Sequence, residues 1–396
     1  MPVVRVGAVN AAHTIGIIGG GQLARMMYEA AIGLDLGVRL LAEGPDVSAA
    51  RVVREVTVGD FTDPAVVREF AAGCDVITFD HEHVPTGLLA GLEAAGVLVR
   101  PGPAALVHAQ DKLLMRERLG DGLGLPCPRW RACRDADELR ALGSELGWPV
   151  IAKASRGGYD GHGVWRLDGP ADADAPFEES LSVSAGERVV IIGEEFVDFA
   201  RELSVVVVRG PDGRALSYPV SETVQDGGVC VETTTPAPGL SAARQSGIRA
   251  LGLRIADALA VVGLLAVELM ERRDGGVVVN ELAMRPHNTG HWTLDGAVTS
   301  QFENHLRAVA GLPLGATDAR APWCTMRNVL GGRSADSVGD FAHVAAADPG
   351  LRVQFYGKSL RPGRKRGHVT VYGDDCDRVR ARARAAAAYL MGEDND

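Results

Sequence analysis

Short apolar runs alternate with amphipathic segments in the first hundred residues, a pattern typical of parallel α/β structure. Runs at residues 14–18, 38–42 and 76–79 predict buried strands, and the segments between them predict helices. The first run leads through three glycines at residues 19–21 into a helical pattern. A strand, a glycine turn and a helix open a Rossmann-like unit, in which the helix N-terminus can meet a phosphate group.

The rest of the chain alternates between strand-like and helix-like patterns without an internal repeat. Strands are predicted at residues 149–153, 189–197 and 201–208 and near residues 353 and 369, and helices over residues 104–119, 242–262 and 377–390. The Pro- and Gly-rich residues 100–103 mark a linker, and the small, polar residues 168–187 predict a surface loop. We therefore predict a multidomain protein, whose Rossmann-like first domain is followed by further strands and helices.

Alternating apolar residues predict a β-hairpin with strands at residues 265–271 and 276–282. Asp274-Gly275 is typical of a two-residue turn in which both central residues have positive φ. This turn places Glu268 opposite Glu281, with their Cβ atoms about 5 Å apart. Two like charges so close need a cation or a shifted pKa, and such a pair beside a phosphate substrate commonly holds Mg²⁺. A hairpin in another register, with two solvated glutamates, fits the spacing equally well.

Polar side chains gather directly after this hairpin. Residues 285–292 contain a cation, two imidazoles, an amide and an indole, namely Arg285, His287, His291, Asn288 and Trp292. These groups suit an anionic, hydrogen-bonding ligand. The acids and histidines of residues 80–83 also follow a predicted parallel strand, at the sheet edge where open α/β folds bind ligands. A polar loop that caps a helix is the alternative for that segment.

Two loops could bind phosphate groups. The glycine-rich residues 155–164 follow a predicted strand that ends in Lys153, but they lack the GxxxxGK[ST] sequence of a P-loop. Residues 357–368, GKSLRPGRKRGH, turn at Pro362-Gly363 and are expected to project their cations from a loop. These cations are Lys358, Arg361, Arg364, Lys365, Arg366 and His368. A glycine-rich hairpin without a ligand and a solvated basic loop are the respective alternatives.

Composition narrows the possible partners of this 396-residue chain, whose length suits two or three domains. A net charge of −10 argues against nucleic acid or an anionic membrane as a partner. The arginines of the helix predicted over residues 377–390 do not share one face, so we expect them to be solvated. Six cysteines without metal-binding spacing indicate reduced thiols, and the N-terminus lacks an apolar signal segment, so we expect a cytoplasmic protein.

A dehydrogenase built on the first domain is one alternative. Gly16, Gly19 and Gly21 only approximate the GxGxxG fingerprint, and Glu43 ends the second predicted strand, where a ribose-binding acid would lie. The pattern changes after about 90 residues, however, which is half of a two-part dinucleotide fold. Hydride transfer is therefore the weaker interpretation.

Four motifs in this order resemble the ATP-grasp superfamily, and within it the N-carboxyaminoimidazole ribonucleotide synthetases of purine biosynthesis. They are GGGQLARMM, GGYDGHG, NELAMRPHNTGHWT and RPGRKRGH. The resemblance implies an α/β and α+β multidomain fold, with a Rossmann-like preATP-grasp domain, an ATP-grasp domain that clamps the nucleotide between two α+β lobes, and a small C-terminal domain. The expected ranges are 1–13 for an N-terminal extension, 14–110 for the first domain, 111–312 for the second and 313–396 for the third.

The resemblance also implies the reaction. ATP would phosphorylate bicarbonate to carboxyphosphate, which would carboxylate the exocyclic amine of 5-aminoimidazole ribonucleotide and leave ADP and phosphate. ATP and Mg²⁺, for which Mn²⁺ could substitute, are the implied cofactors. The implied assembly is a homodimer that passes its product to the mutase of the pathway, with no nucleic-acid or membrane partner.

The resemblance assigns residues to roles by their position in the motifs. It implies that Tyr159, Asp160, Lys153, Arg285 and His287 are catalytic. It implies that ATP contacts Lys112, Lys153, Gly158, Tyr159, Asp160, Gly161, His162, Gly163, Val164, Glu194, Glu195, Phe196, Val197, Glu202, Gln225, Asn280 and Glu281. It implies that the ribonucleotide contacts Gly21, Gln22, Leu23, Glu82, Tyr159, Asp160, Arg285, His287, Asn288, Lys358, Arg364 and Lys365. Glu268 and Glu281 are the implied Mg²⁺ ligands, in agreement with the predicted hairpin pairing.

Two further alternatives share the ATP-grasp fold. One is a different ATP-grasp ligase, such as the formate-dependent glycinamide ribonucleotide transformylase or a biotin carboxylase. The HNTGHW and RPGRKRGH loops argue against it, because they look matched to the imidazole ribonucleotide. The other is a non-catalytic nucleotide sensor, which would not need Glu268, Glu281 and Lys153 together.

Overall fold

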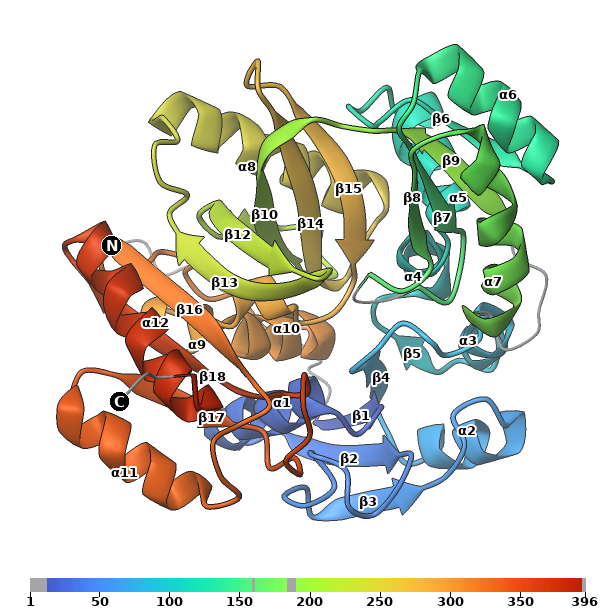
Figure 1. Ribbon diagram of the computed structural model, residues 1–396. Coiled ribbons are helices and arrows are strands. Elements are labelled where there is room, and N and C mark those ends of the chain that lie inside the picture. The colour runs from blue at the N-terminus through green and yellow to red at the C-terminus, as the bar shows by residue number, and fades with distance from the viewer. Residues whose placement is uncertain (1–12, 159–160, 184–189, 394–396) are drawn as a thin grey trace, which may run out of the picture.

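The computed structural model describes residues 13–158, 161–183 and 190–393. These residues form three β-sheets with helices around them. Figure 1 shows the first sheet at the bottom, a small sheet at the upper right, and a large sheet that runs from the upper centre to the left. The prediction of an α/β first part followed by α+β structure is confirmed.

The first sheet is parallel, with the strand order β3-β2-β1-β4-β5. Its strands are β1 (Thr14–Ile18), β2 (Gly37–Ala42), β3 (Glu55–Val58), β4 (Val76–Phe79) and β5 (Leu98–Val99), and its helices are α1 (Gln22–Gly33), α2 (Pro64–Ala71) and α3 (Thr86–Ala94). The three strands predicted from apolar runs are confirmed. The pattern misses the two edge strands because the residues of β3 are partly exposed and β5 has only two residues.

The single helix predicted over residues 104–119 is wrong. α4 (Pro103–Gln110) ends at Asp111, which is extended, with φ −130° and ψ 108°. The Asp111 carboxylate accepts hydrogen bonds from the amides of Leu113 and Leu114 and so starts α5 (Lys112–Arg116). A π-helical turn, Glu117–Gly122, follows. An N-cap inside an apolar pattern therefore breaks the helix just before Lys112.

The small sheet has the strand order β6-β9-β7-β8. Its strands are β6 (Trp130–Cys133), β7 (Val150–Ala154), β8 (Val164–Leu167) and β9 (Ile191–Glu195), and α6 (Ala136–Leu146) packs beside them. The loop predicted over residues 168–187 is also wrong, because a 3-10 turn (Pro170–Asp174) and α7 (Ala175–Val183) lie there. The Asp172 carboxylate accepts from the amide of Gly169, and Ala173 is fully buried.

The large sheet has nine strands in the order β15-β14-β10-β12-β13-β16-β18-β17, with β11 paired to β10. They are β10 (Phe199–Arg209), β11 (Ala215–Ser217), β12 (Ser221–Asp226), β13 (Val229–Thr235), β14 (Gly263–Arg272), β15 (Val277–Ala283), β16 (Trp323–Leu330), β17 (Arg352–Phe355) and β18 (Lys365–Gly373). Helices α8 (Ala242–Ala258) and α10 (Gln301–Ala310) pack on β10 and β14. α12 (Cys376–Met391) packs on β16 and β18, and α11 (Ser337–Ala347) packs on α12. Because β13 pairs with β16, the sheet is continuous across residue 312.

The turn of the β14–β15 hairpin differs from the prediction. The amide of Arg272 donates to the carbonyl of Gly276, and the amide of Gly275 donates to the carbonyl of Arg272. Three residues therefore form the loop, and only its last residue, Gly275, has positive φ, at 88°. Asp274 instead uses its carboxylate to accept a hydrogen bond from the amide of Gly276, so the prediction of two central residues at positive φ is wrong.

The predicted cross-strand pair in this hairpin is confirmed, since Glu268 lies opposite Glu281. Next along β14, however, Leu269 pairs with Val279, so Asn280 is the extra residue of a β-bulge. The bulge shifts the register by one residue and compensates for the longer turn. The Glu268–Glu281 pair is therefore as predicted, but it results from a longer loop and a bulge together, and the prediction included neither.

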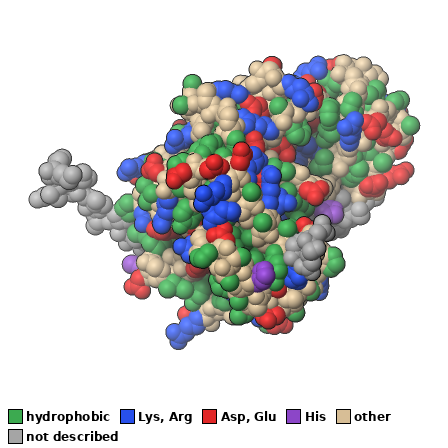
Figure 2. All heavy atoms as spheres, turned by 60° about the vertical axis from the view of Figure 1, so that its left-hand side comes forward, with side chains coloured by type: hydrophobic (Ala, Val, Ile, Leu, Met, Phe, Trp, Pro, Cys, Tyr) green, Lys and Arg blue, Asp and Glu red, His purple; other side chains and the backbone are tan. Residues whose placement is uncertain are grey.

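The arginines of α12 are not a solvated set, contrary to the prediction. Arg380 and Arg384 bind the carboxylate of Glu232 on β13, with Arg384 Nε 2.7 Å from the Glu232 Oε2 atom. Arg382 forms a bidentate pair with Asp348. Residues spaced by four share one helical face, which here lies on the sheet. Figure 2 accordingly shows basic and acidic side chains interspersed over this side of the molecule.

Candidate active site

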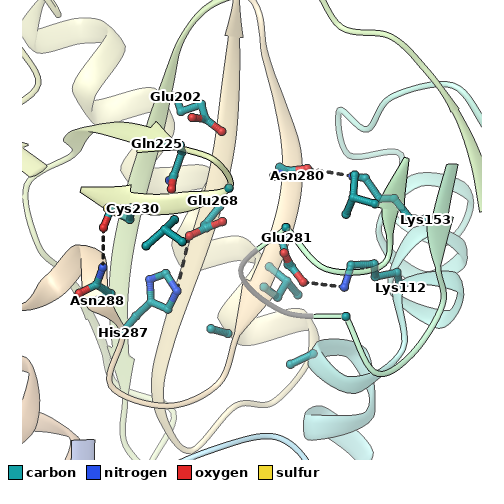
Figure 3. Close-up of a pocket in the computed structure, with 18 of the residues that line it drawn as sticks. Lys112, Lys153, Glu202, Gln225, Cys230, Glu268, Asn280, Glu281, His287 and Asn288 are labelled. Carbon is teal, nitrogen blue, oxygen red and sulfur yellow. Dashed lines mark hydrogen bonds and ion pairs between the residues drawn. The ribbon is translucent and has the colours of Figure 1, made fainter. Parts of the chain in front are cut away.

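A cleft of about 1100 Å³ lies where the three sheets meet. Its walls come from the loop after β4, from α5, from the small sheet, from β10, β14 and β15, and from the loop before β18. Figure 3 shows Glu202, Gln225, Glu268 and Glu281 pointing into it from the large sheet, with Lys112 and Lys153 on the opposite wall. Carboxyl ends of parallel strands and a hairpin thus converge on one space, as expected for a ligand site in an α/β fold.

Lys153, at the end of β7, belongs to a buried ionic network. Its Nζ lies 2.8 Å from Glu194 Oε2 and donates to Asn280 Oδ1 at 3.0 Å. Arg116 Nε donates to the other Glu194 oxygen at 2.7 Å and its guanidinium also reaches two β15 carbonyls. Burial opposes ionisation of Glu194, but Lys153 and Arg116 outweigh it and lower the pKa of Glu194 to about 2.

The helix break at Asp111 brings Lys112 to the metal-binding hairpin expected from the sequence. The Lys112 amide donates to the carbonyl of Ser155 at 2.8 Å, and its Nζ lies 2.7 Å from Glu281 Oε1. Burial alone would lower the pKa of Lys112, but the Glu281 carboxylate raises it. Burial lowers the pKa of Lys153, whereas the Glu194 carboxylate favours its charged form. Lys112 and Lys153 therefore both reach the cleft, the first paired with Glu281 and the second with Glu194.

Two other carboxylates lie close to Glu268 in the cleft. Burial, together with the nearby carboxylates of Glu281 and Glu202, raises the pKa of Glu268 to about 8. A dication between Glu268 and Glu281 would relieve that repulsion, and Mg²⁺ is commonly held by one or two carboxylates plus substrate phosphates. The donor set thus fits Mg²⁺ bound together with a nucleotide. No cluster of three or more His, Cys, Asp or Glu side chains suited to a metal occurs among the described residues.

The other end of the cleft is rich in hydrogen-bond donors. Arg285 Nε donates to Glu82 Oε2 at 2.7 Å, which ties the loop after β4 to the segment after β15. His287 Nε2 lies 3.5 Å from Glu268 Oε1. Burial, with Arg285 and Lys365 nearby, lowers the pKa of His287 to about 3, so this ring is neutral at physiological pH. Lys358, from the loop before β18, donates to the side-chain oxygen of Gln22 at the start of α1.

The basic segment 357–368 is only partly a loop. Lys358, Arg364 and Lys365 line the cleft, whereas Arg366 and His368 are buried within β18. Arg366 donates to the carbonyls of Ser334 and Ala335, and the His368 ring contacts the Tyr356 hydroxyl at 2.7 Å. The prediction that all six cations project from a loop is wrong, because the alternation of β18 turns two of them inward.

Most residues assigned by position line this cleft. They are Gln22, Leu23, Glu82, Lys112, Lys153, Gly158, Gly161, Val164, Glu194, Glu195, Phe196, Val197, Glu202, Gln225, Glu268, Asn280, Glu281, Arg285, His287, Asn288, Lys358, Arg364 and Lys365. Tyr159 and Asp160 lie outside the described residues.

Three assigned residues within the described chain are absent from the cleft lining: Gly21, His162 and Gly163. Gly21 faces Asp80, since a Cβ atom there would lie 2.5 Å from an Asp80 carboxylate oxygen. The carbonyl of Gly163 accepts from the amide of Ala154, so that residue continues the β7–β8 pairing. His162 belongs to the same turn, and its carbonyl oxygen packs against Gly158.

Sequence reasoning missed several groups that shape the cleft. Arg116 is fully buried behind Lys153 and Asn280, and Cys230 and Met270 line the wall. Arg116 stands in the amphipathic stretch of a predicted helix, where nothing distinguishes it from a surface arginine. A buried arginine can be recognised only once its carboxylate partner, here Glu194, is located in space.

Two amides near the start of α1 are bound to carboxylates. The amide of Gly20 donates to Glu43 Oε2 at 3.1 Å, and the amide of Ala24 donates to Asp80 Oδ2 at 3.4 Å. The Glu43 and Asp80 carboxylates therefore place negative charge beside the glycine turn, where a dinucleotide pyrophosphate would bind. This arrangement argues against the dehydrogenase interpretation.

Three family models match the chain. They describe a ribonucleotide synthetase preATP-grasp domain over residues 12–110, an ATP-grasp domain over residues 119–302, and a phosphoribosylaminoimidazole carboxylase C-terminal domain over residues 324–382. The predicted fold class, with these three kinds of domain in this order, is confirmed.

Relatives and solved structures agree with the family models. The N5-carboxyaminoimidazole ribonucleotide synthase of Mycobacterium tuberculosis is 49% identical over 382 residues, which cover 96% of this chain and 88% of the relative. The Thermus thermophilus synthetase structure has a TM-score of 0.84 at 37% identity and covers 96% of this chain and 99% of its own. An Aspergillus clavatus synthase in complex with ADP and 5-aminoimidazole ribonucleotide has a TM-score of 0.84 at 30% identity, covering 96% and 98%. The chain therefore belongs to the N5-carboxyaminoimidazole ribonucleotide synthase family of ATP-grasp ligases.

Proposed function

We propose that this cleft carries out the ATP-dependent carboxylation of 5-aminoimidazole ribonucleotide, with bicarbonate as the carbon source and carboxyphosphate as the intermediate. The carboxylation is the activity of the family to which the chain belongs, in purine biosynthesis. One observation carries the assignment to this cleft. A carboxylate pair suited to Mg²⁺, two largely buried lysines and a second group of cations face the same space.

Lys112 and Lys153 bind the phosphates of ATP in this proposal, and Glu268 and Glu281 hold Mg²⁺ or Mn²⁺. A bound Mg²⁺ would neutralise charge on the transferring phosphoryl group. The two lysines, already fixed by Glu281 and Glu194, supply positive charge without reorganisation during the reaction. The main chain of residues 194–197 contacts the adenine edge, and Glu202 contacts the ribose.

A bicarbonate oxygen attacks the γ-phosphorus of ATP and ADP leaves, which gives carboxyphosphate. The amine of the ribonucleotide then attacks the carboxyl carbon of carboxyphosphate and phosphate leaves. Alternatively, carboxyphosphate first releases phosphate and CO₂, and the amine attacks the CO₂. In both routes the amine gives up a proton. Asp160, outside the described residues, is the proposed proton acceptor, and Tyr159 contacts the ribonucleotide. Glycines 158, 161 and 163 allow the flap to close over the intermediate and exclude water.

The donor-rich end of the cleft binds the ribonucleotide in this proposal. Arg285 and His287 face the reacting end, and Lys358, Arg364 and Lys365 anchor the substrate phosphate. Binding energy from the phosphate then positions the distant amine for attack. Asn288, Glu82 and Gln22 complete the polar wall.

We further propose the domain ranges 14–110, 111–312 and 313–396, a homodimer, and transfer of the product to the mutase of the pathway in the cytoplasm. These assignments rest on the family. None of the helices in the described residues is long and apolar enough to span a bilayer.

Release of ADP by the purified chain, supplied with Mg-ATP and bicarbonate, tests the proposal. We expect release to depend on 5-aminoimidazole ribonucleotide and to match its consumption. Release that does not respond to the ribonucleotide would direct the search to another acceptor for an ATP-grasp ligase. Oxidation or reduction of NAD(H) instead would overturn the ligase assignment.

A further inference from the structure

Two buried hydroxyl groups connect His287 to the large sheet. His287 Nδ1 lies 2.9 Å from the hydroxyl oxygen of Thr289, which lies 2.7 Å from the hydroxyl oxygen of Ser204 on β10. Thr289 is 0% exposed and Ser204 is 1% exposed, so water does not compete for these bonds. Ser204 pairs with Glu268 across β10 and β14, so the sheet that carries Glu268 also holds the imidazole.

The backbone of His287 is held independently. The side chain of Gln301, on α10, accepts from the amide of His287 at 2.9 Å and donates to its carbonyl at 2.7 Å. With the main chain fixed by Gln301 and Nδ1 fixed by Thr289, the ring has one orientation. Its other nitrogen, Nε2, then points into the cleft toward Glu268, as Figure 3 shows.

The hydroxyl protons can be arranged in one consistent direction. Within the described part of the chain, the Ser204 hydroxyl has no acceptor other than Thr289, so it donates to the Thr289 oxygen. The Thr289 hydroxyl then donates its own proton to His287 Nδ1. Because Nδ1 accepts this hydrogen bond it carries no proton, so the ring proton is on Nε2. The reverse direction would leave a buried Ser204 proton without an acceptor, which is costly.

We propose that Thr289 and Ser204 are positioning residues for His287, whose hydroxyl chain holds the imidazole in the Nε2–H form and aims this donor at an anionic oxygen of the reactants. Neither residue touches the cleft itself. The imidazole therefore contributes a hydrogen bond in a fixed direction rather than a proton to be transferred. This role for His287 rests on the proposed function, whereas the hydroxyl chain and the resulting tautomer do not.

Two variants separate the hydroxyl from the shape of the side chain. Thr289→Val keeps the volume and removes the donor, and Thr289→Ser keeps the donor. We expect Thr289→Val and Ser204→Ala to lower kcat by about tenfold or more, in the range seen when a supporting hydrogen bond is lost, with little change in KM for ATP. Thr289→Ser should restore kcat to near the wild-type value. Wild-type kcat in both Thr289→Val and Ser204→Ala would overturn the proposal.

The tautomer can be read without any substrate. In protein labelled with ¹⁵N-histidine, ring-nitrogen NMR, assigned with His287→Asn, should show a protonated Nε2 and an unprotonated Nδ1 for His287. Thr289→Val should move these shifts toward a mixture of tautomers, and Thr289→Ser should not. A wild-type spectrum with the proton on Nδ1 would overturn the proposal even if Thr289→Val fails to fold.

A buried threonine pair elsewhere provides the matched control. The hydroxyls of Thr234 and Thr325 lie 3.1 Å apart, both residues are buried, and neither lines the cleft. Thr234→Val should therefore leave kcat and the His287 spectrum unchanged. If ADP release by the wild type did not depend on the ribonucleotide, the proposed function would be refuted. The substrate-free NMR spectrum would still test the hydroxyl chain.

Discussion

Glu268 and Glu281 show how neighbouring side chains set the charge of single residues in the cleft. The two glutamates face each other across one hairpin, yet their ionisation differs. Burial and the carboxylates of Glu281 and Glu202 raise the pKa of Glu268 to about 8. Burial opposes ionisation of Glu281 as well, but Lys112 outweighs it and lowers the pKa of Glu281. Glu281 therefore already has a cation partner in Lys112, whereas Glu268 needs a dication to stabilise its ionised form.

Replacement of either glutamate should remove the proposed metal site. We expect Glu281→Ala to abolish turnover, because Mg²⁺ loses a ligand and Lys112 loses the group that holds it. Steady-state ADP release, measured over a range of Mg²⁺ concentrations, is the test. The control is Glu303→Gln, which removes a carboxylate from a surface pair with Arg307 on α10 and should retain activity. Near-normal turnover in Glu281→Ala would refute the assignment of the hairpin.

Lys365 distinguishes the two ends of the cleft. We expect Lys365→Ala to raise KM for the ribonucleotide by about tenfold or more and to change KM for ATP little, because a charged phosphate contact is lost. Initial rates with each substrate varied in turn will separate the two effects. Arg361, in the loop that leads to Lys365 at the start of β18, lies outside the cleft lining and provides the matched control Arg361→Ala. Equal increases for both substrates would mean that this loop serves a different part of the site.

At the scale of elements, the sequence predicts strands and motifs better than it predicts boundaries. Apolar runs identify β1, β2 and β4 because those strands are buried on both faces. The break at Asp111 is invisible in the apolar pattern, since it depends on one carboxylate that caps α5 and on a contact between Lys112 and Ser155, which follows β7 far along the chain. The cleft could be predicted largely from motifs, but the buried partner Arg116 could not.

The hairpin illustrates why a correct pair does not prove a correct register. The actual loop is one residue longer than the predicted turn, and the bulge at Asn280 cancels the difference. The bulged residue is also useful, because its side chain accepts a hydrogen bond from Lys153 at 3.0 Å. Bulges are set by contacts across the fold, which a single strand sequence does not contain.

The ionic network around Glu194 joins β9 to β7 and α5, and its contribution to stability should depend on pH. The pKa of Glu194 is lowered from 4.5 to about 2, so its stabilising effect is complete above pH 4.5 and disappears as pH falls toward 2. The expected loss is on the order of 3 kcal/mol. Thermal unfolding of the wild type and of Glu194→Gln between pH 6 and 2 is the measurement.

We expect Glu194→Gln to be less stable at neutral pH, because Arg116 and Lys153 keep buried charges without a carboxylate partner. The difference in stability between Glu194→Gln and the wild type should shrink as the pH falls from 4.5 toward 2. Glu138→Gln is the control, since Glu138 pairs with Arg134 at the surface of the small sheet. A difference that stays constant down to pH 2 would show that Glu194 does not titrate as described.

At the scale of the whole molecule, the continuous large sheet joins the ATP-grasp part to the C-terminal part. β13 pairs with β16, and α12 lies against the far end of the sheet (Figure 1). The carboxylate of Glu232 on β13 is fully buried and binds Arg327 of β16 together with Arg380 and Arg384 of α12. One acid therefore secures the elements behind the loop that carries Lys365 into the cleft.

Glu232→Ala should loosen this junction. Three arginines lose their shared partner, and because they keep partial contact with solvent we expect a loss of roughly 2 to 4 kcal/mol, at or below the value for a fully buried pair. Hydrogen exchange should rise first in α12 and β16, and KM for the ribonucleotide should increase. Arg384→Ala is the control, because Arg384 is 52% exposed and its removal leaves Glu232 with two other arginines. Its expected cost is below about 1 kcal/mol, as for partly exposed ion pairs. If Glu232→Ala and Arg384→Ala lowered the free energy of unfolding equally, the network would be a set of independent surface pairs. If hydrogen exchange in α12 did not change in Glu232→Ala, apolar packing alone would hold the C-terminal part to the sheet.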